Sequence, residues 1–198
     1  MKVYMPGRAL AVIALLLLMM ACAASKPGLR AYRQGDYAAA IKESTPHAEN
    51  GDAYSQWLLG SSYANAEPPI KDIREAERWI KKAADQDFVP AMVDLAKISL
   101  FYDSVKNEQV AYGWYQKAAN YGNSEAQFML GLYSFSGTGG SAKDDVKAFT
   151  WLLLSAKQGH PLAKLMLEKS KDKISQMDLG KAQQMASEWR PINTKKEE

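Results

Sequence analysis

The side chains that most often carry out chemistry are sparse in this sequence. Its 198 residues contain two histidines, His47 and His160, and one cysteine, Cys22. The histidines lie far apart along the chain, so we do not expect them to share a metal or a catalytic site. The stretch GTGG at residues 137–140 lacks the Lys-Ser/Thr and the preceding strand that a phosphate-binding P-loop requires. The sequence therefore predicts a protein that is not an enzyme and holds no metal and no cofactor.

The charge balance narrows the class of partner. The chain carries 25 basic and 22 acidic residues, for a formal net charge of +3. Because nucleic-acid binding depends on many phosphate contacts, this small surplus gives no electrostatic case for it. No small-molecule substrate is expected either. Hydrophobic residues make up 47% of the chain, which is enough to bury the core of one domain.

The first residues have the features of an export signal. Lys2 and Arg8 precede an unbroken apolar run over residues 9–20. As a helix this run would span roughly 18 Å, which is short of the bilayer's hydrocarbon core of about 30 Å. We therefore predict a signal peptide over residues 1–21. A membrane-anchoring helix is the alternative.

Two processing sites are possible around Cys22. The stretch LMMAC at residues 18–22 resembles the bacterial lipobox, although Met19 stands where that family usually has leucine. The resemblance implies a lipid on Cys22, a tether over residues 22–27, and attachment to the periplasmic face of the outer membrane. Alternatively, Ala21, Cys22 and Ala23 form a small-x-small site for ordinary signal peptidase; Cys22 is then removed, and the mature protein is soluble in the periplasm.

The aromatic residues point to a repeat. Trp79, Trp114 and Trp151 each follow an alanine by three residues, and an Asp or Asn stands four residues before that alanine. The Asp/Asn positions are spaced by 36, 35, 37 and 34 residues, which is typical of a solenoid. The five pairs are Asp36 with Ala40, Asp72 with Ala76, Asn107 with Ala111, Asp144 with Ala148, and Asp178 with Ala182, where Met185 takes the tryptophan position.

Each Asp or Asn is expected to be the N-cap of a helix, accepting hydrogen bonds from the free N–H groups of the first turn. The helix then carries alanine, tryptophan and an alanine pair on one face. Alanines allow a neighbouring helix to approach closely, so we predict that the tryptophan, Trp114 for example, is buried in the seam between helices. A Trp-Tyr platform for a sugar or cofactor is the alternative.

A second helix is expected before each of these, over residues 53–63, 90–100, 125–135 and 161–170. These segments share a column of small residues and a column of leucines four residues later. Gly60 and Gly131 follow the leucine, and a glycine inside a helix suggests that another backbone comes close. Residues 28–37 look like a shortened first hairpin, and no segment alternates like a strand. The columns are Ser55, Ala91, Ala126 and Ala163, then Leu59, Leu95, Leu130 and Leu167.

The stretches AQFMLG (residues 126–131), NEQVAYGWYQKAANYG (107–122) and DDVKAFTWLLLSAKQG (144–159) resemble the Sel1-like repeat family, a relative of tetratricopeptide repeats. The resemblance implies an all-α fold, a right-handed α-solenoid of about four to five stacked helical hairpins, over residues 28–190. A charged tail over residues 191–198 is expected to be disordered.

The family also implies a protein partner, held on a concave groove formed by the first helix of each hairpin. We therefore expect a non-enzymatic binding protein of the bacterial cell envelope. The first alternative is an immunity protein that neutralises a secreted phospholipase toxin in the periplasm, and the second is an envelope-polymer hydrolase.

The expected partner-binding residues form two columns on the first helices. One column lies just before the core leucines, at a position that is commonly polar and groove-facing in the family. Three of its four residues here are apolar, as in the centre of an interface. The alternatives are that a tight superhelix buries these residues, or that the partner uses the loop at residues 137–145. The predicted residues are Leu58, Asp94, Met129 and Met166, with Ser62 and Tyr133 one turn further on.

Overall fold

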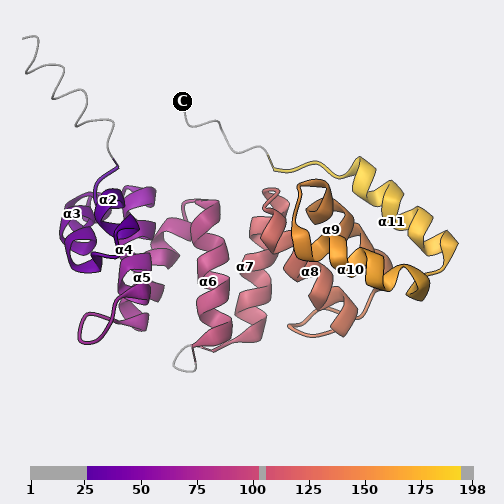
Figure 1. The fold of residues 1–198 in the computed structure, drawn as a ribbon, viewed down its shortest axis with the longest axis horizontal. Coiled ribbons are helices and arrows are strands. Elements are labelled where there is room, and N and C mark those ends of the chain that lie inside the picture. The colour runs from indigo at the N-terminus through magenta and orange to yellow at the C-terminus, as the bar shows by residue number, and fades with distance from the viewer. Residues whose placement is uncertain (1–25, 103–105, 193–198) are drawn as a thin grey trace, which may run out of the picture.

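The computed structural model describes residues 26–102 and 106–192, and this part of the chain is helical with no strand (Figure 1). From α2 to α10 each helix packs on the next along an elongated array, and α11 packs on α9. This arrangement confirms the predicted all-α repeat solenoid. A 3₁₀ turn over Lys171–Lys173 joins the last two helices. The α-helices are α2 (Leu29–Arg33), α3 (Tyr37–Glu49), α4 (Ala53–Asn65), α5 (Ile73–Ala84), α6 (Val89–Phe101), α7 (Glu108–Asn120), α8 (Ser124–Ser136), α9 (Asp145–Lys157), α10 (Pro161–Ser170) and α11 (Gln176–Glu188).

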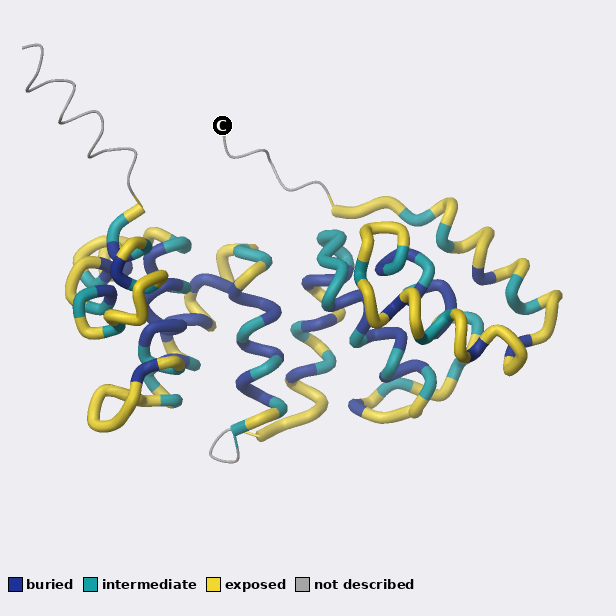
Figure 2. The backbone as a smooth tube through the Cα atoms, viewed as in Figure 1, coloured by how far each residue is buried: buried dark blue, intermediate teal, exposed yellow. Residues whose placement is uncertain are grey.

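The helices alternate between two roles. The four that begin a hairpin, α4, α6, α8 and α10, are called the first helices below, and α3, α5, α7, α9 and α11 are the second helices. Buried positions follow the contact side of each helix, while the loops and outer turns are exposed (Figure 2). The largest buried cluster runs through α5, α6, α7 and α8 in the middle of the array.

Four of the five predicted N-caps are confirmed. The side chains of Asp36, Asp72, Asn107 and Asp144 each accept a hydrogen bond from a backbone N–H in the first turn of the following helix. The fifth prediction was wrong. Helix α11 begins earlier, with Ser175 as its N-cap, and Asp178 lies in its first turn. The Ser175 hydroxyl accepts from the Asp178 N–H and donates to its carboxylate, so the two residues cap the helix together.

The predicted close approach at the glycines is confirmed. A Cβ added to Gly60 would lie 2.8 Å from the Ala76 carbonyl oxygen and 2.6 Å from Ile80 Cγ1. At Gly131 it would lie 2.8 Å from Leu152 Cδ2 and 3.3 Å from the Ala148 carbonyl oxygen. In these two hairpins, α4–α5 and α8–α9, the backbone at the alanine of the second helix therefore packs directly against the first helix.

The predicted burial of the tryptophan is confirmed for Trp79, which is 6% exposed, but the position that is fully buried in all three hairpins is the next one. Four residues after the alanine, and directly after each tryptophan, stand Ile80, Tyr115 and Leu152, and all three are fully buried. Trp114 and Trp151 are only half-buried at the flank of the seam. Positions are counted here from the repeat alanine. Because a helix has 3.6 residues per turn, position +4 points toward the same face as the alanine and the alanine pair at +7 and +8, while position +3 points to the flank of that face.

The end of the described chain folds back on the array. After α11, Trp189 and Pro191 pass beside Gly122, and the Ile192 N–H donates to the Asn120 carbonyl oxygen at 2.8 Å. We call residues 189–192 the C-terminal strap. It connects the end of α11 with the end of α7, which lies two second helices earlier in the chain.

Candidate binding surface

Three of the six predicted partner-binding residues are part of the core. Leu58 and Ser62 are 0% exposed and Tyr133 is 5% exposed. Leu58 is covered by the start of α2, where a Cβ on Gly28 would lie 3.2 Å from Leu58 Cδ2. The Ser62 hydroxyl donates to the Leu58 carbonyl oxygen at 2.7 Å. The expectation that these three side chains face a groove is therefore wrong.

Tyr133 is buried by aromatic packing. Its ring lies edge-on to Tyr112 with centroids 5.4 Å apart, and 6.4 Å from the ring of Tyr115. Burial raises the pKa of the Tyr133 hydroxyl to about 12, since the ionised form would lose its solvation. Burial raises the pKa of Tyr115 as well.

The other three predicted residues, Asp94, Met129 and Met166, are half-buried. On α6 and α8, the next accessible residue lies three positions after the predicted one, and not four. Lys97 follows Asp94 and Leu132 follows Met129 in this way, and both remain partly exposed. The predicted step of four residues leads instead to Ser62 and Tyr133, which lie in the core. We call this accessible side the first-helix face; it comprises Asp94, Lys97, Phe101, Met129, Leu132 and Met166.

A pocket of about 290 Å³ opens on the first-helix face between α4 and α6. Its walls include Tyr32 of α2, Phe101 at the end of α6, and Tyr102 after it. Its polar lining comes from Ser61, Asn65, Asp94 and Lys97. We call it the first-helix pocket.

The Asp94 carboxylate is held by a bond between hairpins. The Trp57 indole N–H donates to Asp94 Oδ2 at 2.7 Å, which joins α4 to α6. Burial raises the pKa of the Asp94 carboxyl, while the Trp57 hydrogen bond and the charge of Lys97 act in the opposite direction. Lys97 makes its ion pair with Glu125 of the next hairpin at 2.9 Å, and not with Asp94.

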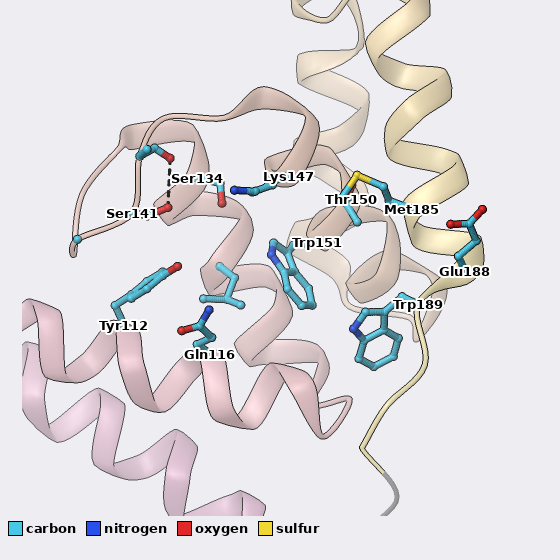
Figure 3. A pocket seen from close by; sticks show the side chains of 13 residues that line it. Tyr112, Gln116, Ser134, Ser141, Lys147, Thr150, Trp151, Met185, Glu188 and Trp189 are labelled. Carbon is cyan, nitrogen blue, oxygen red and sulfur yellow. Dashed lines mark hydrogen bonds between the residues drawn. The ribbon is translucent and has the colours of Figure 1, made fainter.

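A larger cleft lies on the other side, between the second helices α7, α9 and α11 (Figure 3). It encloses about 650 Å³, and Trp151 and Trp189 stand on its wall with ring centroids 6.3 Å apart. Tyr112 and Gln116 of α7 face them across the cleft (Figure 3). Sequence reasoning missed this cleft because it took Trp151 as buried; the glycine-rich loop, which supplies Gly140 to the lining, was the available signal.

The ionisable side chains of the described residues do not gather into a reactive group. No three His, Cys, Asp or Glu side chains in residues 26–102 and 106–192 are placed to hold a metal ion. His160 serves as an N-cap, its Nδ1 accepting from the Ala163 N–H at 3.3 Å, and its ring stacks on Phe128. His47 lies in the last turn of α3, far along the chain from His160.

The predicted export features lie outside the described part of the chain. Cys22, the signal peptide and most of the predicted tether precede residue 26, and most of the predicted tail follows residue 192. Within the described residues, no helix combines the length and hydrophobicity that a membrane span requires.

The repeat geometry agrees with a known family. A family model for the Sel1 repeat matches residues 53–88, 89–123 and 124–160. The chain belongs to the Sel1 repeat family. The three matches coincide with the hairpins α4–α5, α6–α7 and α8–α9. The resemblance drawn from the sequence is thereby confirmed.

Two solved Sel1-type structures are similar to this chain. One is a protective antigen of uropathogenic Escherichia coli with an SLR fold, which is 29% identical with a TM-score of 0.68 over 76% of this chain and 32% of the antigen. The other is a Sel1 repeat protein of Oxalobacter formigenes, 33% identical with a TM-score of 0.59 over 65% of this chain and 97% of that protein. A Sel1 repeat fold of this kind supports protein–protein interaction as the general role.

Two curated relatives are named as regulators. An exopolysaccharide production negative regulator of Rhizobium leguminosarum is 28% identical over 69% of this chain. Chitin synthase regulatory factor 3 of Schizosaccharomyces pombe is 36% identical over 60% of this chain. The chain spans 56% of the length of the first regulator and 12% of the second.

Proposed function

We propose that this protein is a non-enzymatic binding protein of the bacterial cell envelope that holds a protein partner on its first-helix face. The observation that carries the proposal is the composition of this face. Phe101 is 73% exposed at its edge, and Met129 and Leu132 of α8 are partly accessible. Large apolar side chains that are exposed to solvent and bordered by charged residues are typical of an interface core with a polar rim.

Methionine suits such a surface because its flexible thioether adapts to an irregular partner. Asp94, Lys97 and Glu125 supply charged groups of both signs around Met129. The names of the curated relatives, which describe regulators, agree with a protein that acts by binding.

The location in the envelope belongs to the same proposal. It rests on the basic start, the short apolar run and Cys22 in the sequence. With a lipid on Cys22, the solenoid would lie close to the outer membrane on its periplasmic face; without the lipid it would be soluble in the periplasm. Radiolabelled palmitate incorporation, lost in Cys22→Ser, tests this part by itself.

Affinity capture from envelope extracts tests the binding surface. Met129→Glu places a charge in the centre of the face and should abolish capture of the partner. Because Met129 is half-buried, Phe101→Ser is the second variant: its side chain is exposed, so the fold should remain intact while capture falls. Val110→Ser is the matched control, since it removes a side chain that is exposed on the second helix α7.

Equal capture by all three variants, with unchanged thermal midpoints, would show that the partner does not use the first-helix face. The captured protein also decides between a scaffold and an immunity role. A secreted phospholipase would identify the chain as its immunity protein, and components of envelope assembly would identify a scaffold.

A further inference from the structure

The first-helix pocket contains more hydrogen-bond acceptors than the protein itself uses. Asp94 Oδ2 accepts from the Trp57 indole, but no described residue donates to its second oxygen. Asn65 uses its Nδ2 group to donate to the Ser61 carbonyl oxygen and the Tyr32 hydroxyl, and its Oδ1 has no donor among the described residues. A bound group that donates several hydrogen bonds would satisfy these acceptors.

Ser61 is a further polar group in the pocket that a bound group would reach. Its side chain is 3% exposed and lines the pocket, and its hydroxyl has no hydrogen-bond partner in the described part of the chain. A buried hydroxyl without a partner is destabilising, so such groups are rarely left unsatisfied. It lies near the Asp94 carboxylate, although not in hydrogen-bonding geometry.

The walls of the pocket favour a planar cation. Tyr32, Phe101 and Tyr102 present aromatic rings, which attract cations through their faces. The ammonium of Lys71 already lies 5.8 Å from the centroid of the Tyr102 ring, so this ring accepts a cation within the protein. Lys97, which lines the pocket, is paired with Glu125, and no described residue forms an ion pair with Asp94.

We infer that the first-helix pocket receives an arginine side chain of the protein partner, with Asp94 as its counter-ion. The guanidinium group carries five N–H donors in a fixed plane, which matches a carboxylate and stacks on aromatic rings. Asp94, Asn65 and Ser61 would accept its hydrogen bonds, and the tyrosine rings would cover its faces. This inference names the recognition chemistry of the proposed partner and so rests on the proposed function.

The burial of Asp94 agrees with this assignment. Desolvation raises the pKa of its carboxyl, which means that the free protein holds the charge at a cost. An incoming guanidinium would offset that cost.

The experiment uses the Trp57 indole N–H as a reporter, because it is bonded to Asp94. The purified protein is titrated with acetyl-Gly-Arg-Gly-amide and followed by ¹H–¹⁵N NMR. We expect the Trp57 indole resonance to shift with this peptide and to stay in place with acetyl-Gly-citrulline-Gly-amide, which has the same shape without the charge. A lysine peptide should bind more weakly, because an ammonium lacks the planar fork of donors.

Asp94→Asn separates the ligand role from the structural one. The asparagine amide oxygen can still accept from Trp57, so the thermal midpoint should not fall, but affinity for the arginine peptide should drop about tenfold or more. Trp57→Phe is the matched control: it removes the bond between hairpins and should lower the midpoint while leaving the charge of Asp94 in place. In that variant, the peptide is followed through the backbone resonances of Asn65 and Lys97.

A shift with the citrulline peptide, an equal response to lysine, or unchanged affinity in Asp94→Asn would each overturn the assignment. These outcomes are distinct from failure of the proposed function. If Met129→Glu abolishes partner capture but Asp94→Asn does not, the face is correct and the arginine site is wrong. If the arginine peptide binds as predicted but capture yields no partner, the pocket does bind a guanidinium group and the proposed function is wrong.

Discussion

The same tryptophan position has opposite surroundings at the two ends of the solenoid. Trp79 in α5 is 6% exposed and forms a cluster with Ala48 of α3 and Leu59 of α4, with Ile41 packed beside it. Trp151, two repeats later in α9, is half-buried and lines the 650 Å³ cleft. Both follow an alanine by three residues, yet Trp79 is part of a buried cluster and Trp151 lines an open cleft.

The difference lies in what occupies the space beside each tryptophan. Next to Trp79, the preceding second helix α3 contributes small and branched side chains that close the gap. Next to Trp151, the loop after α8 packs on Tyr112 and Tyr133, where a Cβ on Gly139 would lie 2.6 Å from the Tyr133 ring. The C-terminal strap borders the other side. A repeat position therefore has a fixed place on its helix, while its burial depends on the neighbouring elements.

The largest expected effect tests this contrast directly. Trp79→Ala should cost about 3–5 kcal/mol of unfolding free energy, because it removes a buried aromatic side chain. Trp151→Ala should cost about 1–2 kcal/mol, since part of that side chain is already solvated. Urea denaturation of both variants measures the difference.

Trp114 should behave like Trp151, whereas its neighbour Tyr115 should match Trp79 when changed to alanine. Equal losses for Trp79→Ala and Trp151→Ala would show that the cleft is closed in solution.

The glycine contacts sharpen the comparison within the seam. Gly60→Ala should cost about 1–3 kcal/mol, because its Cβ would meet the backbone at Ala76 as well as Ile80. Gly131→Ala should cost less, because the nearest backbone atom there, the Ala148 carbonyl oxygen, lies at 3.3 Å and not at 2.8 Å. Thermal and urea unfolding of both variants provide the measurement.

Gly113→Ala is the control for helix propensity. No atom lies within 4 Å of a Cβ built at Gly113, so this variant should gain about 0.5–1 kcal/mol. If Gly60→Ala is stabilised to the same extent, the two helices do not approach each other as described.

Alkaline pH should act on the middle of the solenoid. The pKa of Tyr133 is raised from 10.0 to about 12, so the folded state disfavours the ionised phenol. Its contribution to stability is fully present below pH 10 and is lost as the pH rises from about 10 to about 12, on the order of 2 kcal/mol. Urea unfolding at several pH values measures this loss.

Tyr133→Phe is the matched variant for the alkaline experiment. It cannot ionise at this position, so its stability should decline less between pH 10 and pH 12. A decline as steep as that of the unmodified protein would assign the loss to other groups.

The smallest expected effect concerns the end of the array. Ser175→Ala should cost about 1 kcal/mol, because Ser175 is the N-cap of α11. Asp178→Ala should cost less, since Asp178 lies in the first turn and its role is shared with Ser175. Chemical denaturation in low salt can resolve the two losses of stability. A larger loss for Asp178→Ala than for Ser175→Ala would indicate that Asp178 is the N-cap, as the repeat spacing predicted.

The local features of this protein follow from short stretches of its sequence. The caps Asp72 and Asn107, the close approach at Gly60 and the period of the hairpins could all be predicted, because each depends on residues within a few turns of the same helix or hairpin. The Sel1 motif was recognisable for the same reason.

Which flank of each helix is accessible depends instead on the packing of neighbouring elements. Leu58 and Asp94 occupy the same repeat position, but α2 buries the first, while the second accepts a bond from Trp57 and lines a pocket. The cleft beside Trp151 likewise depends on a loop and on the C-terminal strap. These contacts join segments that are distant in the sequence, and their geometry depends on how successive hairpins are rotated and joined, which no local pattern of residues specifies.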